Sequence, residues 1–202
     1  MVNQESYIKF QCNLIVTKLD EFPEFFELNA LRHKLLEQNF IGANSDGTGF
    51  GNLSICCGST NQFIVTGTAT GGIKELKLEH YAKVTAYDFA KNSLTCEGEI
   101  KASSESLSHA AIYESDINIK AVAHIHSLEL WEKLLNKVPT TSEECAYGTP
   151  ELAFAIKKLF VNTNLVEQKI IVLGGHREGI MLFASSIQKV DNFAQQLLST
   201  FE

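Results

Sequence analysis

A pair of histidines separated by one residue is the feature of this sequence that points most directly to chemistry. His124 and His126 lie in the apolar segment 121–126, which we expect to be a buried strand in which Val122 and Ile125 serve packing. Successive side chains of a strand point to opposite faces, so the two imidazoles project together from one face. They form a ready pair of metal ligands, although two histidines on the wet face of an edge strand would give the same pattern.

Two further groups complete the candidate site. His176 follows the apolar run 170–173, and Glu105 lies upstream of the histidine pair. Three neutral imidazoles around Zn²⁺, with a fourth position open to a water, a substrate or a carboxylate, are typical of a catalytic zinc site. No cysteine pair has the spacing of a zinc finger. We therefore interpret the three histidines as metal ligands, with zinc first among the divalent ions that such a set accepts.

Small polar and glycine residues in three places are candidates for binding an anion. Ser103 and Ser104 precede a predicted helix over 106–116, where free backbone N–H groups either receive a serine cap or hold an anion. Two glycine-rich loops, 42–51 and 66–72, lie between predicted elements. Glycine there permits positive φ and a close approach of the backbone to a ligand. Capping and anion binding can coexist at one helix end.

The elements that must position these groups alternate between strands and helices. Alternating apolar residues predict a half-buried first strand that includes Ile8 and ends at Val16, and leucines at helical spacing predict an amphipathic helix over 27–39. The polar face of that helix would include Arg32, His33, Lys34 and Glu37. The pattern also predicts hairpins of 52–57 with 63–66 and of 82–89 with 93–97, strands over 169–173 and 179–183, and helices over 128–136, from Thr149, and from a capping box at 185–188 to about 201.

Length and composition favour a single domain over residues 1–202, with an N-terminal extension over 1–26 that holds an extra strand. Of the 202 residues, 45% are hydrophobic, which is enough for a substantial core. Five cysteines, an odd number, are typical of thiols in a reducing compartment and not of a secreted disulfide framework. The net charge of −7 without a Lys/Arg cluster argues against nucleic acid, and no apolar run is long enough to cross a bilayer. We expect a cytoplasmic protein without nucleic-acid or membrane partners.

The order and spacing of these motifs resemble those of the class II aldolase/adducin family, which is typified by fuculose-phosphate aldolase. The resemblance runs from about Leu28 to the C-terminus. It rests on Gly51-Asn52-Leu53-Ser54, the loop 66–72, Ser103-Ser104-Glu105 with His109 four residues on, His124-Ile125-His126, and His176. The family implies an α/β fold, with a central, mostly antiparallel sheet between helical layers (α/β/α), assembled as a homotetramer with sites near subunit interfaces.

The resemblance also implies roles for these residues. The three histidines would bind zinc, and Glu105 would act as the catalytic acid/base and approach the metal itself. We expect His109 to serve helix packing. The phosphate of a substrate would be cradled by Gly51, Asn52, Thr70, Gly71, Ser103 and Ser104. In the loop 66–72 the match is ambiguous by a residue or two, so Thr68 competes with Thr70.

Such a site supports lyase chemistry on a small phosphorylated sugar or a related hydroxy-carbonyl compound. A metal chelated by a hydroxyl and an adjacent carbonyl oxygen acts as a Lewis acid and stabilises an enediolate. The carboxylate of Glu105 would shuttle the proton, with a pKa lifted towards neutrality by burial. Aldol cleavage is the leading reaction. A dehydratase or epimerase on the same scaffold, or a non-catalytic assembly module of the adducin type, are the alternatives.

Several departures from the family pattern stand out. The stretch 127–148 is shorter than in the sugar-phosphate aldolases, and Tyr147 matches their second proton donor poorly, so we expect it to be a packing residue. Arg177 and Glu178 intervene before Gly179 where the family has His-Gly directly. We expect the C-terminal tail that completes a neighbouring site in those aldolases to be missing. The first strand has no counterpart and would cover a sheet edge or serve assembly.

Overall fold

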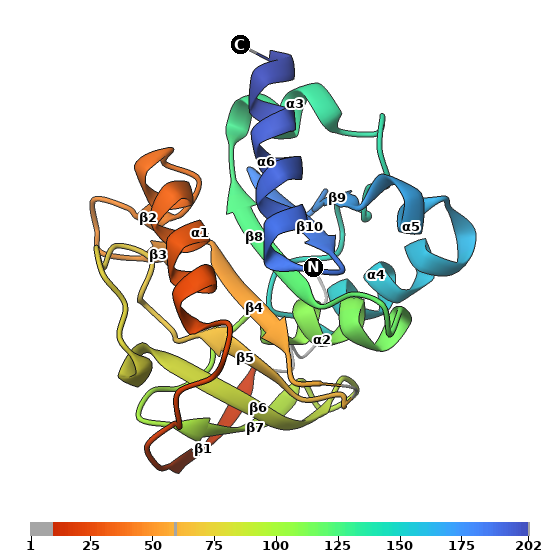
Figure 1. Cartoon of the computed structure of the whole chain (residues 1–202). Helices are drawn as coiled ribbons and strands as arrows, with labels where there is room; N and C mark the ends of the chain where they lie inside the picture. The colour runs from red at the N-terminus through yellow and green to blue at the C-terminus, as the bar shows by residue number, and fades with distance from the viewer. Residues whose placement is uncertain (1–9, 59, 202) are drawn as a thin grey trace.

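A mostly antiparallel sheet of eight strands forms the centre of the molecule (Figure 1). The computed structural model describes residues 10–58 and 60–201. Among the described strands, β1 and β7 pair in parallel and all other neighbours in this sheet are antiparallel, as expected. The order along the sheet is β1 (Gln11–Val16), β7 (Ser93–Gly98), β6 (Tyr81–Asp88), β5 (Phe63–Thr66), β4 (Asn52–Cys56), β8 (Ala121–His126), β10 (Gly179–Ala184) and β9 (Ile170–Val172).

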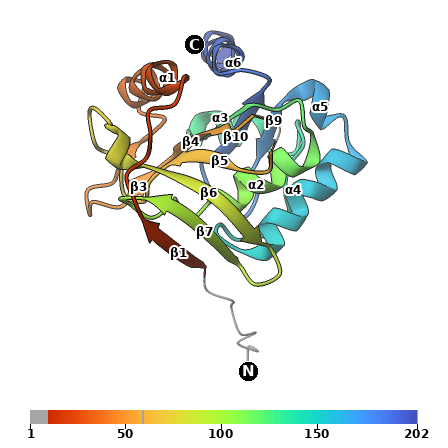
Figure 2. The ribbon, with the colours of Figure 1, turned by 60° about the horizontal axis from the view of Figure 1, so that its bottom comes forward.

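Helices cover both faces of this sheet and produce the expected three layers (Figure 2). One face is covered by α1 (Phe25–Glu37) and α6 (Ile187–Phe201), and the other by α2 (Ser106–Ser115) and α4 (Pro150–Asn162). The remaining described elements are α3 (Leu128–Leu134), α5 (Leu165–Gln168), the 3-10 turn η1 (Leu78–His80), and a small sheet of β2 (Gly42–Ala43) and β3 (Gly49–Phe50).

Alternation along β8 divides its side chains between two buried clusters. Ala123 and Ile125 pack in the cluster that includes α1 and α6, whereas Val122 packs in the cluster that includes α2 and α4. His124 and His126 share the face of Val122 because side chains two residues apart on a strand point the same way. The strand therefore directs both histidines toward the layer that contains α2 and α4.

The first described strand covers one edge of the sheet. Ile8, which the alternating pattern placed in this strand, lies outside the described residues, and β1 begins at Gln11. Its pairing with β7 runs from Gln11 opposite Ser93 to Val16 opposite Gly98. The N-terminal strand thus shields the edge of β7, which is one of the two roles that we expected.

The start of the last helix differs by one residue from the predicted capping box. The Oγ of Ser186 accepts a hydrogen bond from the backbone N–H of Lys189 at 3.3 Å. The Oγ of Ser185 instead accepts from the side-chain Nζ of the same lysine at 2.8 Å. The cap is therefore Ser186, whereas the pattern favoured the serine before it.

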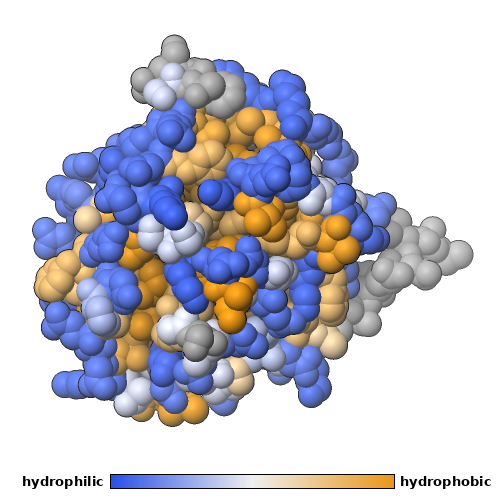
Figure 3. Space-filling view, turned by 45° about the vertical axis from the view of Figure 1, so that its right-hand side comes forward, coloured by the Kyte–Doolittle hydropathy of each residue, from blue (hydrophilic) through white to orange (hydrophobic). Residues whose placement is uncertain are grey.

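Apolar side chains are exposed on the outer side of α4 and α5. Phe154 and Val161 of α4 are 49% and 84% exposed, and Val166 of α5 is 50% exposed. Figure 3 views the molecule from the side that lies to the right in Figure 1, and apolar side chains interrupt the hydrophilic ones there.

Within 10–58 and 60–201, no helix has both the length and the apolar character needed to traverse a membrane.

Arg32 is buried, which corrects the expectation that it lies on the solvated face of the first helix. Its side chain is 2% exposed. The guanidinium donates to the backbone carbonyl oxygens of Thr70 at 3.0 Å, Gly71, and Lys74 at 3.2 Å. The segment after β5 therefore folds over α1 and is held there by Arg32, together with Asn29, whose Nδ2 donates to the carbonyl oxygen of Leu76 at 3.1 Å.

We expect Arg32→Met to lower the free energy of unfolding by about 2–4 kcal/mol, because three carbonyl oxygens lose their donor in a site closed to water. Urea denaturation at neutral pH measures the difference. The matched control is His33→Met on the same helix, where the side chain is 46% exposed; its effect should stay below about 0.5 kcal/mol. Equal unfolding midpoints for the two variants would show that Arg32 does not hold this segment.

Candidate metal centre

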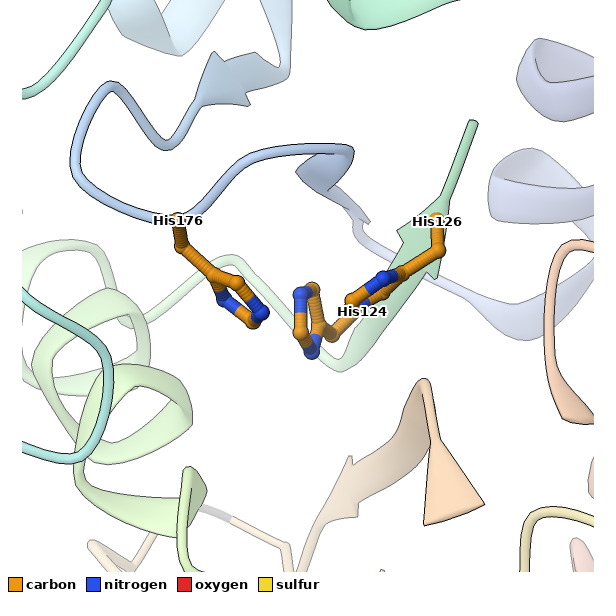
Figure 4. Close-up of side chains that lie close together, drawn as sticks. All are labelled: His124, His126 and His176. Carbon is orange, nitrogen blue, oxygen red and sulfur yellow. The ribbon is translucent and has the colours of Figure 1, made fainter. Parts of the chain in front are cut away.

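Three histidines from two segments of the chain converge at one end of the sheet (Figure 4). His124 and His126 come from β8, and His176 comes from the loop between β9 and β10. One ring nitrogen from each residue lies within 4.8 Å of the others. The three side chains interpreted as metal ligands are therefore neighbours in space.

Backbone pairing and a glycine fix the position of the third histidine. Gly179 of β10 lies opposite His126 of β8, and its carbonyl oxygen accepts the N–H of Leu173 at 3.0 Å. A Cβ at position 179 would lie 3.0 Å from His176 Nδ1 and 3.1 Å from His124 Nε2. These distances are tighter than most Cβ contacts, so a side chain at position 179 would push on both rings, and glycine leaves them room.

The nitrogen atoms of this cluster suit a divalent cation. His124 Nε2 and His176 Nδ1 are buried and have no hydrogen-bond partner among the described residues. A buried polar atom without a partner is costly unless a ligand satisfies it. Burial, reinforced by the neighbouring imidazoles, lowers the pKa of His126 to about 3, so this ring is neutral at physiological pH. Neutral imidazole is the form that binds metal ions.

Glu105 lies between two of the histidines, just before α2. Its Oε2 is 2.6 Å from His124 Nδ1, and its Oε1 is 3.1 Å from His176 Nδ1. Burial acts to raise the pKa of this carboxyl, as the sequence suggested. The imidazoles of His124 and His176 outweigh burial and hold the pKa of Glu105 well below its usual range. The expected shift towards neutrality is therefore wrong for this arrangement, in which the carboxylate is ionised.

Asn52 connects Glu105 to a histidine on α2. The amide Nδ2 of Asn52 donates to Glu105 Oε2 at 3.2 Å, and its Oδ1 accepts from His109 Nε2. The other ring nitrogen of His109, Nδ1, is 2.7 Å from Ser54 Oγ. His109 is thus hydrogen-bonded at both nitrogens, which corrects its assignment to helix packing. Its spacing was a usable signal, because residues four apart, such as 105 and 109, lie on the same side of a helix.

The loop 66–72 packs tightly against the other glycine-rich loop. Thr70 is 4% exposed, and its hydroxyl donates to the carbonyl oxygen of Gly67 at 2.8 Å. A Cβ at Gly71 would lie only 2.1 Å from the carbonyl oxygen of Gly42. Thr68 is exposed. The hydroxyl of Thr70 is therefore committed to its own loop, whereas Thr68 remains accessible.

The remaining residues expected at a phosphate site lie beside the carboxylate and the histidines. Ser103 is buried and its Oγ accepts the N–H of Glu105 at 3.4 Å, whereas Ser104 is exposed next to the start of α2. Gly51 has a φ of +73°, and a Cβ there would lie 3.1 Å from the carbonyl oxygen of His124. Both serines are thus near Glu105, while Gly51 allows β4 to lie close to β8.

Two residues outside the predicted set also lie at the cluster. Tyr147 is 59% exposed, and its ring centroid is 4.8 Å from that of His176. This position corrects its expected role as a packing residue. Glu178 has a φ of +73°, and its Oε2 is 3.9 Å from His126 Nδ1. Glu178, one of the two residues between His176 and Gly179, therefore brings a second carboxylate near the histidines.

Comparisons with known proteins show a shared fold. L-fuculose 1-phosphate aldolase superposes with a TM-score of 0.64 at 21% identity, covering 91% of this chain and 85% of that chain. YgbL from Klebsiella pneumoniae gives 0.62 at 20%, covering 87% and 84%. The sugar-phosphate aldolase from Thermotoga maritima gives 0.59 at 15%, covering 86% and 92%.

A comparison of the sequence with protein-family models identifies the family. A comparison with curated proteins finds no match. The sequence does match the family described as "Class II Aldolase and Adducin N-terminal domain" over residues 37–198, a range that contains every residue of the site described above. The chain belongs to the class II aldolase and adducin family.

Proposed function

We propose that this protein is a metal-dependent lyase that cleaves a carbon–carbon bond in a small phosphorylated sugar or a related hydroxy-carbonyl compound. The observation that carries the proposal is the convergence of His124, His126 and His176 around unpartnered ring nitrogens, with the carboxylate of Glu105 in contact. A non-catalytic assembly module has no need for such a set of buried, unsatisfied nitrogens.

The three histidines would hold the cation, with zinc as the first candidate. When bound, a divalent cation supplies Lewis acidity to adjacent hydroxyl and carbonyl oxygens of a substrate. Glu105 would accept the substrate hydroxyl proton and return a proton to the carbon released by cleavage. Because Glu105 is only 8% exposed, competing water has little access to its oxygens.

The phosphate group would be bound at the start of α2. Ser103 and Ser104 lie there, and free N–H groups at the start of a ten-residue helix favour an anion. Gly51, Asn52, Thr70 and Gly71, also expected from the resemblance, would contribute mainly by shaping the backbone around this place, since the Thr70 hydroxyl is committed to Gly67. Thr68 is the accessible hydroxyl of that loop.

We expect His124→Ala, His126→Ala and His176→Ala each to abolish zinc retention, because the remaining two imidazoles cannot hold the ion alone. Plasma mass spectrometry of purified protein should give about one zinc per chain in the parent and almost none in these variants. His33→Ala, on the exposed side of α1, is the control and should keep its zinc. Circular dichroism establishes that each variant is folded. Stoichiometric zinc in all three variants would refute the ligand assignment.

We expect Glu105→Gln to keep the metal and to lower kcat by about 10²–10⁴-fold, the usual contribution of a positioned general base. The assay screens phosphorylated sugars with zinc-loaded protein and identifies the products by mass spectrometry. A lyase gives two smaller carbon fragments. A dehydratase instead gives a product lighter by one water, and an epimerase leaves the mass unchanged. Glu114→Gln, at the other end of α2, is the matched control. Parent-like turnover in Glu105→Gln would exclude Glu105 as the acid/base.

We also propose self-association, for which the exposed apolar residues Phe154, Val161 and Val166 offer a surface. Light scattering of the purified protein should give four times the chain mass of 22.4 kDa if the homotetramer expected from the resemblance forms. A mass equal to one chain at micromolar concentration would refute it. The cytoplasmic location expected from the sequence stays a prediction.

A further inference from the structure

A chain of buried polar side chains extends from Glu105 into the core between the sheet and α2. Tyr113 Oη lies 2.8 Å from Ser54 Oγ, which lies 2.7 Å from His109 Nδ1. His109 Nε2 contacts Asn52 Oδ1, and Asn52 Nδ2 donates to Glu105 Oε2 at 3.2 Å. Three side chains, those of Ser54, His109 and Asn52, therefore connect a core tyrosine to the carboxylate of the candidate site.

These hydrogen-bonded side chains are buried, so each of their polar atoms needs its hydrogen-bond partner. Ser54 and His109 are 0% exposed, and Asn52 and Tyr113 are 5% and 6% exposed. Apolar residues of the cluster around α2 surround them. Water has little access to replace a missing partner, so each lost bond would leave a buried polar atom unsatisfied.

The amide of Asn52 sets the direction of these hydrogen bonds. Its Nδ2 donates to Glu105 Oε2, and its Oδ1, which can only accept, faces Nε2 of His109. The Nε2 of His109 must then carry the proton. Burial lowers the pKa of His109 to about 3, so the ring is neutral and its Nδ1 accepts from the hydroxyl of Ser54. Ser54 in turn accepts from Tyr113. The opposite direction would place the Asn52 oxygen against the carboxylate.

The two oxygens of Glu105 consequently have different surroundings. Oε2 accepts from Asn52 and lies 2.6 Å from His124 Nδ1. Oε1 is buried, makes no hydrogen bond among the described residues and lies 3.1 Å from His176 Nδ1. One oxygen is held by an amide donor, whereas the other has only the histidine cluster beside it.

We propose that His109 is a positioning residue that acts through Asn52 to hold Glu105 Oε2, so that Glu105 accepts and returns protons at Oε1. The proton-transfer part of this inference rests on the proposed lyase function. It also changes the role of Asn52, whose amide is committed to Glu105 and His109 and serves orientation of the carboxylate before any contact with substrate phosphate.

The test compares His109→Gln with His109→Met in the zinc-loaded full chain. Glutamine can place an amide N–H near the former Nε2, whereas methionine has similar bulk and no donor. Loss of an outer partner at metal sites typically costs about 10–100-fold, so His109→Met should lower kcat by that factor, with KM changed less than about 3-fold and zinc content unchanged. His109→Gln should recover most of the lost kcat. Equal losses in both variants, or a loss confined to KM, would overturn the inference.

A second measurement does not depend on turnover. Two-dimensional ¹⁵N spectra of the histidine rings in the metal-free parent should show a neutral histidine with its proton on Nε2 whose signal vanishes in His109→Gln. Tyr113→Phe, which removes only the distant hydroxyl, should shift that signal and lower kcat by less than His109→Met does. A proton on Nδ1 would overturn the proposed direction even if no cleavage is found. Failure to find cleavage with the correct ring form would instead refute the lyase function alone.

Discussion

The contact between one buried carboxylate and two imidazoles is the interaction on which the site depends. Glu105 lies 2.6 Å from His124 and 3.1 Å from His176, and each of these residues comes from a different element. An ionised carboxylate in a closed site is costly unless its oxygens find partners. The sheet, α2 and the β9–β10 loop must therefore meet closely at this point, because a gap in any of them would leave the charge without compensation.

Glycine residues, which have no side chain, allow the strands and rings at this point to lie close together. Gly179 leaves room for the rings of His124 and His176, and Gly51 lets β4 lie against the backbone of β8. In the loops beyond, Gly71 lies against the carbonyl oxygen of Gly42. The buried guanidinium of Arg32 donates to the carbonyl oxygens of Thr70 and Gly71 in the same loop, so this donor stabilises the tight packing together with the glycines.

Local sequence rules predicted the elements well because each rule depends on neighbours in the chain. Alternation along 121–126 placed both histidines on one face, and the cap at Thr149 was found as expected. Arg32 was misplaced because helical periodicity cannot reveal that a loop forty residues later folds over the helix. The pKa of Glu105 was misjudged for the same reason, since burial was anticipated and the opposing imidazoles come from distant segments.

The role of Asn52 shows how a correct motif can carry an incomplete interpretation. The resemblance to the class II aldolase/adducin family implies that the amide of Asn52 faces substrate phosphate. The amide oxygen of Asn52 instead accepts from His109, and its nitrogen donates to Glu105. An asparagine amide has one oxygen and one nitrogen, so using both in the core leaves little freedom to follow a ligand. Under the proposed function, an anion would therefore be recognised by groups without such obligations, namely the exposed Ser104 and the N–H groups at the start of α2. This helix would then present its N-terminus to the anion and, one turn later, His109 to Asn52, so that one rigid element would link binding and proton transfer.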